Sequence, residues 1–243
     1  ISEVAIYANR SFDFAYCMPF LPFFPIQNYL NDTDNILMSF DVQYLPDESK
    51  QFYLLLLMDE WSPKYTFEQD NHNWFAWQGG MEINNVIFRK NKIRIEYTWV
   101  DHRVYHHRFH VNDYYSWGYP VGFWGGPHSE ELFMDYSVDW KNNIFQLYFS
   151  YVRRGEYTDD MRADQYSRPS EAPIYKRFSG TIESKKIIGL HWKYSINKNM
   201  YIKTQYQHII WDNAGFNPTV PIAGNELPDI TKNSIGITVL YTF

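Results

Sequence analysis

Residues 132–140 read LFMDYSVDW, and every even-numbered position from Leu132 to Trp140 is large and apolar. Asp135, Ser137 and Asp139 occupy odd-numbered positions between them. Alternation of period two predicts a β-strand, because successive side chains of a strand point to opposite sides. One face of this strand is expected to be apolar and the other polar.

The same alternation recurs along the whole chain, and no stretch has apolar residues at helical spacing over three turns. We therefore expect an all-β protein. About ten strands are predicted, at residues 12–16, 36–44, 51–59, 75–83, 93–99, 132–140, 144–152, 188–196, 200–210 and 235–243.

Short and long connections between these strands alternate along the chain. Short polar turns are predicted at 46–50, 89–92, 141–143 and 197–199, and long connections at 18–34, 61–73, 101–130, 153–178 and 211–232. All long loops then lie at one end of the sheet, which is typical of an outer-membrane barrel with tight periplasmic turns. We expect a transmembrane antiparallel up-and-down β-barrel in the outer membrane of a Gram-negative bacterium. Strand alternation alone also fits a soluble β-protein.

The composition of the chain excludes several other classes of protein. The chain has 243 residues, 20% of them aromatic, with a mean hydropathy of −0.48 and a net charge of −6. Such apolar content excludes disorder, and the acidic balance argues against a nucleic-acid partner. The lone Cys17 excludes an intramolecular disulfide framework. No apolar run reaches the ~18 residues of a membrane-spanning helix.

Aromatic residues lie near the ends of the predicted strands, where barrels carry girdles at the two membrane interfaces. We assign to these girdles Tyr44, Trp61, Trp74, Trp99, Trp140, Trp192, Trp211 and Tyr241. The chain ends on Phe243, the last apolar position of its final predicted strand. A terminal aromatic strand of this kind resembles the signal recognised by the barrel assembly machinery, which we expect as a partner during biogenesis.

Several motifs carry a resemblance to a known family. They are IEYTWV at 95–100, YHH at 105–107, YPVG at 119–122 and GGPHS at 125–129, with similar stretches at 34–61 and 7–25. In this order they resemble the capsule assembly protein Wzi family. That family has Arg where Trp99 stands and Asp where His128 stands.

The resemblance implies an outer-membrane barrel of about eighteen strands that acts as a lectin for surface polysaccharide. We therefore expect residues 1–243 to form a single barrel domain that lacks its N-terminal portion. The missing wall would come from N-terminal strands or from a partner chain. Closure of ten strands on themselves is the other possibility. The implied function is binding of extracellular polysaccharide to attach or assemble a capsule or surface glycan layer.

The long connection at 101–130 is rich in aromatic and planar polar side chains, which together suit the apolar faces and hydroxyl rims of sugars. The expected glycan-binding residues are Arg103, Tyr105, His107, Tyr114, Trp117, Tyr119, Trp124 and His128. The same rings could instead pack as a plug. The arginines of 153–178, namely Arg153, Arg154, Arg162, Arg168 and Arg177, could bind acidic sugars or the phosphates of lipopolysaccharide.

Polar residues of the strands are expected to line the barrel interior and to pair there, namely Arg94, Glu96, Asp135 and His191. We expect no catalytic residue, since no nucleophile has a recognisable neighbourhood. We also expect no metal and no cofactor. His102, His106 and His110 share parity and could ligate a metal if the segment is extended, although residues four apart on one face of a strand are far apart. Outer-membrane lipid, lipopolysaccharide and surface polysaccharide are the expected partners. A transport or secretion-associated barrel, and less readily a barrel hydrolase, are the alternative functions.

Overall fold

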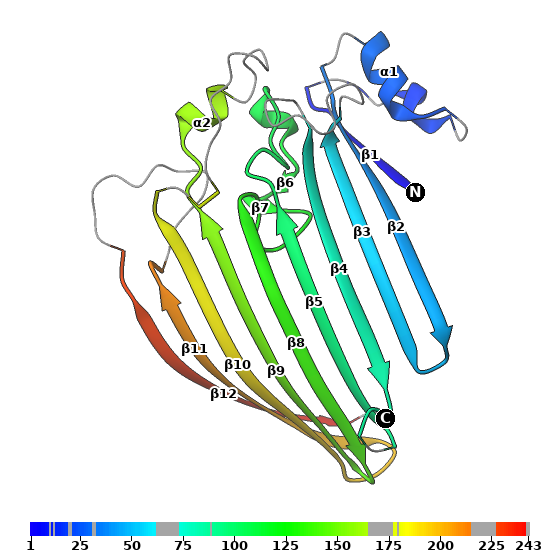
Figure 1. The fold of residues 1–243 in the computed structure, drawn as a ribbon, viewed down its shortest axis with the longest axis vertical. Helices are drawn as coiled ribbons and strands as arrows, with labels where there is room; N and C mark the ends of the chain where they lie inside the picture. Colours follow the sequence, from blue (N-terminus) through cyan, green and yellow to red (C-terminus); the bar gives the residue numbers. More distant parts are fainter. Residues whose placement is uncertain are drawn as a thin grey trace.

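A single antiparallel sheet of ten strands dominates the chain (Figure 1). The computed structural model describes residues 1–9, 11, 13–18, 21–30, 33–61, 73–87, 89–164, 177–178, 180–214 and 227–241. The strands of the sheet, in spatial order, are β1 (Ser2–Ile6), β2 (Asn35–Asp47), β3 (Lys50–Glu60), β4 (Trp74–Asn84), β5 (Asn91–Val100), β8 (Ser129–Trp140), β9 (Asn143–Gly155), β10 (Ile182–Ser195), β11 (Met200–Asp212) and β12 (Ile230–Tyr241).

Each strand pairs with the next strand of the sheet along the chain, so the sheet is an up-and-down meander. The all-β prediction is confirmed, and nine of the ten predicted strands are present. The remaining elements are short: the hairpin β6 (Tyr115–Ser116) and β7 (Tyr119–Pro120), the helices α1 (Phe23–Tyr29) and α2 (Asp159–Asp164), and the 3-10 helices η1 (Phe14–Cys17) and η3 (His110–Asn112). Neither α1 nor α2, the α-helices of the described residues, has the length and apolar character to cross a membrane.

The strand predicted at 12–16 is wrong over its described residues. Phe14–Cys17 forms η1, because the Asp13 side chain accepts a hydrogen bond from the Ala15 N–H at 2.9 Å and caps the turn. The strand beside β2 is instead β1, in which Val4 pairs with Leu37. Phe12 and Phe243 lie outside the described residues.

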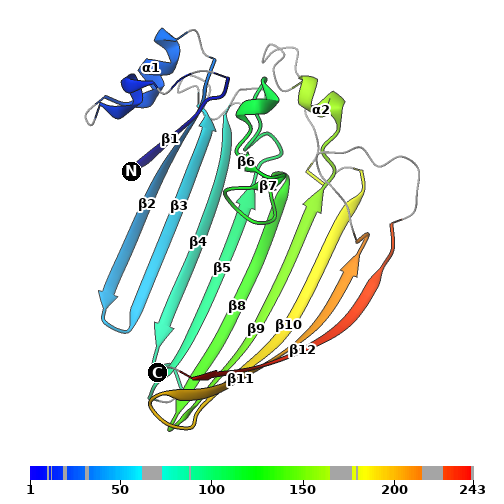
Figure 2. The same ribbon diagram turned by 180° about the vertical axis from the view of Figure 1, so that it is seen from behind.

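The sheet is strongly curved, and its connections are distributed unequally between its two ends (Figure 2). The connections from β2 to β3, β4 to β5, β8 to β9 and β10 to β11 are short and lie at one end. Helices α1 and α2 and the β6–β7 hairpin lie at the other, which we call the loop end. The sheet is not closed: within the described residues, β1 and β12 form its two edges and do not pair with each other. Closure of these ten strands on themselves is therefore not observed.

The cross-strand register separates two faces. Ile93, Tyr136, Leu147, Leu190, Tyr206 and Ile235 are successive partners across six strands and share one face, which we call the apolar face. Many of its side chains are exposed, Ile235 at 72% and Leu147 at 53% among them. Arg94, Asp135 and Tyr148 are successive partners on the opposite face, which we call the polar face.

Two members of the predicted aromatic girdles lie on the polar face instead. Trp74 has the parity of Ala76, which pairs with Val100 on the polar face, and it is 2% exposed. Trp211 pairs with Lys185, whose partner on β9 is Val152. These two girdle assignments were wrong because the face of a strand residue depends on its parity, and Trp74 and Trp211 have the parity of the polar face.

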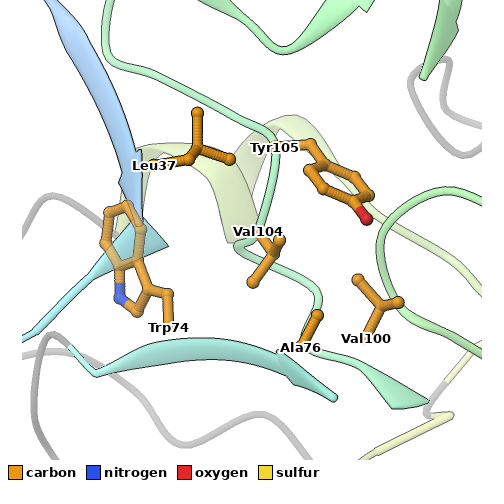
Figure 3. Close-up of a cluster of buried hydrophobic side chains, with 6 residues drawn as sticks. All are labelled: Leu37, Trp74, Ala76, Val100, Val104 and Tyr105. Atoms are coloured by element: carbon orange, nitrogen blue, oxygen red, sulfur yellow. The ribbon is translucent and has the colours of Figure 1, made fainter. Parts of the chain in front are cut away.

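The buried core, whose six side chains are drawn in Figure 3, lies on the polar face at the loop end. Leu37 and Ala76 of the sheet pack there against Val104 and Tyr105 of the connection between β5 and β8. The Tyr105 N–H also donates to the buried Asp59 carboxylate at 2.6 Å. These contacts fasten the 101–128 connection onto the sheet and thereby position the loop segments that follow.

Candidate ligand-binding groove

A groove of about 500 Å³ lies at the loop end of the polar face, between the β6–β7 hairpin and strands β9, β10 and β11. Its aromatic side is formed by residues of the 115–126 segment. Its sheet side is formed by side chains of the three strands. The lining residues are Tyr115, Trp117, Gly118, Tyr119, Pro120, Trp124, Gly125, Gly126, Val152, Arg154, Glu183, Lys185 and Trp211.

The hairpin turn explains how Trp117 reaches the solvent. Ser116 pairs with Tyr119, so Trp117 and Gly118 are the two central residues of the turn. Both have positive φ, 51° and 80°, as a type I′ turn requires. Glycine adopts this conformation easily, whereas a bulky residue does so at a cost. Because Trp117 is a central residue of this turn, its ring lies at the tip of the hairpin, where it is 97% exposed.

Two further rings extend the aromatic side of the groove. Tyr119 is 75% exposed and Trp124 is 53% exposed. The indole N–H of Trp124 donates to Glu131 Oε2 at 3.0 Å, which fixes the orientation of its ring. Glu131 in turn accepts a hydrogen bond from the Ser150 hydroxyl at 2.6 Å, so the carboxylate that holds Trp124 is itself held.

The sheet side of the groove is charged. Arg154 and Glu183 form an ion pair with an Nη2–Oε2 distance of 2.5 Å, and the Trp211 indole N–H donates to Glu183 Oε1 at 2.6 Å. Lys185 lies with its Nζ 4.3 Å from the centre of the Trp211 ring. No carboxylate of the described residues pairs with Lys185. The groove thus has two cations against one carboxylate, and the Lys185 ammonium remains available to a ligand.

Of the eight predicted glycan-binding residues, the groove brings together Trp117, Tyr119 and Trp124. Arg103 instead holds the loop, donating from Nε to Asp101 at 2.8 Å. Tyr105, 2% exposed, belongs to the core. Its neighbour Tyr114 packs against that core.

His107 and His128 are both buried outside the groove. The His107 backbone N–H donates to Asp113 Oδ1 at 2.7 Å. His128 is fixed between two backbone groups: its Nδ1 lies 2.6 Å from the Glu156 carbonyl oxygen, and its Nε2 accepts from the Phe178 N–H at 3.0 Å. Burial lowers the pKa of His128, so the neutral ring that these two bonds require is favoured.

Two of the three histidines weighed as metal ligands, His102 and His106, serve in packing contacts. His106 stacks on Tyr157 with ring centres 4.4 Å apart, and His102 lies beside the His128 ring at 5.7 Å. His110 lies in η3 with its side chain 73% exposed. Across the described residues, no three His, Cys, Asp or Glu side chains form a group that could hold a metal ion.

The predicted interior residues lie together on the polar face, nearer its middle. Arg94 Nε is 3.0 Å from Glu96 Oε2, and Arg94 Nη2 is 3.5 Å from Asp135 Oδ2. The Gln146 amide donates to Asp135 at 3.0 Å, and its oxygen lies 3.2 Å from His191 Nδ1. This amide therefore connects His191 to Asp135, which Arg94 connects to Glu96. The arrangement braces adjacent strands.

Sequence reasoning missed part of the groove. Glu183 and Lys185 received no assignment, and Trp211 was placed in a girdle. Glu183 and Lys185 are odd-numbered residues of β10, as is His191, which was expected on the polar face. The same parity could have placed both charged residues on that face. Of the arginines in 153–178, Arg154 lines the groove, whereas Arg168 and the side chain of Arg162 lie outside the described residues.

Comparisons with known proteins add no family assignment. No protein-family model matches the chain, and no curated protein matches it at a significant level.

Proposed function

We propose that this chain forms part of the wall of an outer-membrane β-barrel and binds surface polysaccharide in the groove at its loop end, helping to attach a capsule or similar glycan layer. The observation that carries the proposal is the groove itself. Three exposed rings face a charged floor there, on a sheet whose opposite face is apolar.

The apolar face supports placement in a membrane. Apolar side chains follow each other across the sheet in rows, many of them exposed, and a large exposed apolar surface marks a site of contact with a membrane or another protein. Glu130 and Trp140 lie on this face ten residues apart along β8. At ~3.4 Å per residue that separation is about 34 Å. A strand tilt of about 40° projects it to roughly 26 Å, close to the ~25 Å apolar band of such barrels.

The open edges support a wall larger than this sheet. An unpaired strand edge exposes backbone N–H and C=O groups, and lipid offers these groups no hydrogen-bond partner. We therefore propose that further strands, from the same polypeptide or from a partner chain, pair with β1 and β12. The barrel of about eighteen strands implied by the Wzi-family resemblance is one such arrangement.

The composition of the groove supports a sugar ligand. Sugars present apolar C–H faces that pack on aromatic rings, and hydroxyl groups that pair with planar polar side chains. Trp117 and Trp124 supply rings of the first kind, while Arg154 and Glu183 supply groups of the second kind. The groove is open to solvent at the loop end, where an extended polymer could lie across it.

A glycan array with the purified protein tests this function. Trp117→Ala and Trp124→Ala should each weaken binding of the recognised glycan about fivefold or more, since a central aromatic contact is worth ~1 kcal/mol or more. Tyr29→Ala is the matched control, because Tyr29 is 87% exposed but lies on α1 outside the groove. Glycan binding that survives both tryptophan substitutions unchanged would refute the proposed site.

A further inference from the structure

A second charged cluster lies on the apolar face at the loop end, separated from the groove by the thickness of the sheet. The register places Trp99, Glu130, Arg153 and Ser184 side by side across β5, β8, β9 and β10. The next row toward the turns contains Tyr97, Leu132, Tyr151 and Lys186. Below these two rows the same strands carry mainly apolar side chains.

Glu130 holds two arginines at this position. Arg153 donates from Nε to Glu130 Oε1 at 2.7 Å, and Arg177 Nε lies 3.7 Å from Glu130 Oε2. Tyr97 donates its hydroxyl proton to the same carboxylate at 2.8 Å. The Phe178 ring lies under both guanidinium groups, 4.8 Å from that of Arg153 and 4.4 Å from that of Arg177.

Arg177 is anchored further by the backbone. Its two terminal nitrogens donate to the carbonyl oxygens of Val100 at 3.1 Å and Ser129 at 2.8 Å, and its guanidinium lies 4.6 Å from the Trp99 ring. Arg153 remains more accessible, with 40% of its side chain exposed. The pair is therefore ordered before any ligand arrives, which reduces the entropy lost on binding.

Lys186 adds a third cation. Its Nζ lies 5.3 Å from the Tyr151 ring, and no carboxylate of the described residues pairs with it. Asp212, at the end of the first row, accepts a hydrogen bond from the Ser184 hydroxyl at 2.6 Å. The cluster thus contains three cations against two carboxylates, of which Glu130 is shared by both arginines.

This charge lies where the apolar band ends, beside aromatic residues that favour a membrane interface. A cation on a lipid-facing surface needs an anionic partner or a route to water. We propose that Arg153, Arg177 and Lys186 form a site for the phosphorylated headgroup of a membrane lipid. In the outward-facing leaflet of an outer membrane that lipid is lipopolysaccharide, whose lipid A phosphates match preorganised guanidinium groups. The inference rests on the membrane placement proposed above.

The test uses the full chain, extracted from outer membranes in a neutral detergent. Binding of lipopolysaccharide is measured for the unaltered protein and for Lys186→Gln and Arg153→Gln, with dephosphorylated lipopolysaccharide as the matched ligand. Each substitution should weaken binding of the phosphorylated lipid about fivefold, the effect of one cation near a membrane surface, and leave binding of the dephosphorylated lipid unchanged. Lys232→Gln is the control variant, since Lys232 pairs with Ile209 on the polar face.

The outcomes separate this site from the proposed function. Equal affinity of the unaltered protein and both variants for lipopolysaccharide overturns the lipid site, while the outer-membrane location and glycan binding stand. If fractionation finds the protein outside the outer membrane, the proposed function and the lipid site both fail. A fivefold loss in the two variants, with glycan-array binding unchanged, supports the lipid site independently of the groove.

Discussion

Arg153 and Arg154 are neighbours in β9 and form ion pairs on opposite faces of the sheet. Arg153 pairs with Glu130 on the apolar face, and Arg154 pairs with Glu183 in the groove of the polar face. The period of two that predicts the strand also separates these two charges. Because each pair has its own surroundings, the glycan and lipid proposals can be tested with substitutions at adjacent positions.

The Lys185 ammonium is expected to give the groove a preference for acidic polysaccharide. Lys185→Gln should weaken binding of an acidic polymer about two- to fivefold, the effect of one partly exposed ion pair, and leave a neutral polymer unaffected. The preference should diminish at high salt because exposed charges are screened. Binding titrations at two salt concentrations measure this, with Lys203→Gln as the control on the same face. An equal loss for both polymers would contradict a charge effect.

Gly155 is expected to be intolerant of a side chain. A Cβ there would lie 2.4 Å from His128 Cε1, and the His128 ring is fixed by two hydrogen bonds and stacks on Phe178. Gly155→Ala should lower the free energy of unfolding by about 1–3 kcal/mol, the usual cost of overpacking.

Gly79→Ala provides the matched control. Its added Cβ would meet Leu54 and Trp77 at ordinary contact distances of 3.8 and 3.9 Å. Denaturant unfolding in detergent measures both variants, and similar losses in the two would show that the His128 contact is not responsible.

The loop end should lose stability in mild acid. Burial lowers the pKa of His102 to about 4, against the attraction of Asp101, which raises it. The unfolded chain takes up a proton on this imidazole near pH 6.5 and the folded chain only near pH 4, so the free energy of unfolding falls as the pH drops through that window.

Unfolding curves at pH 7 and pH 4.5 measure this loss. His102→Gln should reduce the difference between the two curves, with the remainder expected from His128, whose pKa burial also lowers. His110→Gln is the control, because the His110 side chain is 73% exposed. A His102→Gln curve with the full pH dependence of the unaltered protein would overturn the assignment.

The outer edge of β12 is expected to be paired in the membrane. Within the described residues β12 bonds only to β11, so half of its backbone groups face away from the sheet. If further strands complete the wall, all amides of β12 should exchange with deuterium as slowly as those of β11. Rapid exchange at every second amide of β12, in protein held in a bilayer, would contradict a completed wall.

The strands were predictable because their faces meet different surroundings. Alternation is regular at 93–99 and 132–140 because the odd-numbered positions of the first range and the even-numbered positions of the second are all large and apolar. Residues 12–16 show the same alternation, yet the described part of them is helical because Asp13 caps a local turn. Alternation over so few residues does not outweigh one hydrogen bond between a side chain and the backbone.

The groove was only partly predictable. Trp117 stood out because it lies in an aromatic-rich connection, and the positive φ of the hairpin turn explains its exposure. Tyr105 belongs to the same connection, but its burial depends on contacts with Leu37 and Ala76, which are distant in sequence. The charged floor required knowing that β9, β10 and β11 end beside this connection, and strand order is not encoded in any single segment.

The division of β9 between two faces also determines which changes in chain length the protein can absorb. One residue inserted before Arg153 would exchange the faces of all residues that follow in the strand, so Arg153 would move to the polar face and Arg154 to the apolar face, each away from its present partner, Glu130 or Glu183. An insertion in a loop-end connection leaves every strand in register. Length variation among natural versions of this chain should therefore be concentrated in its loops, while each strand keeps its residue count.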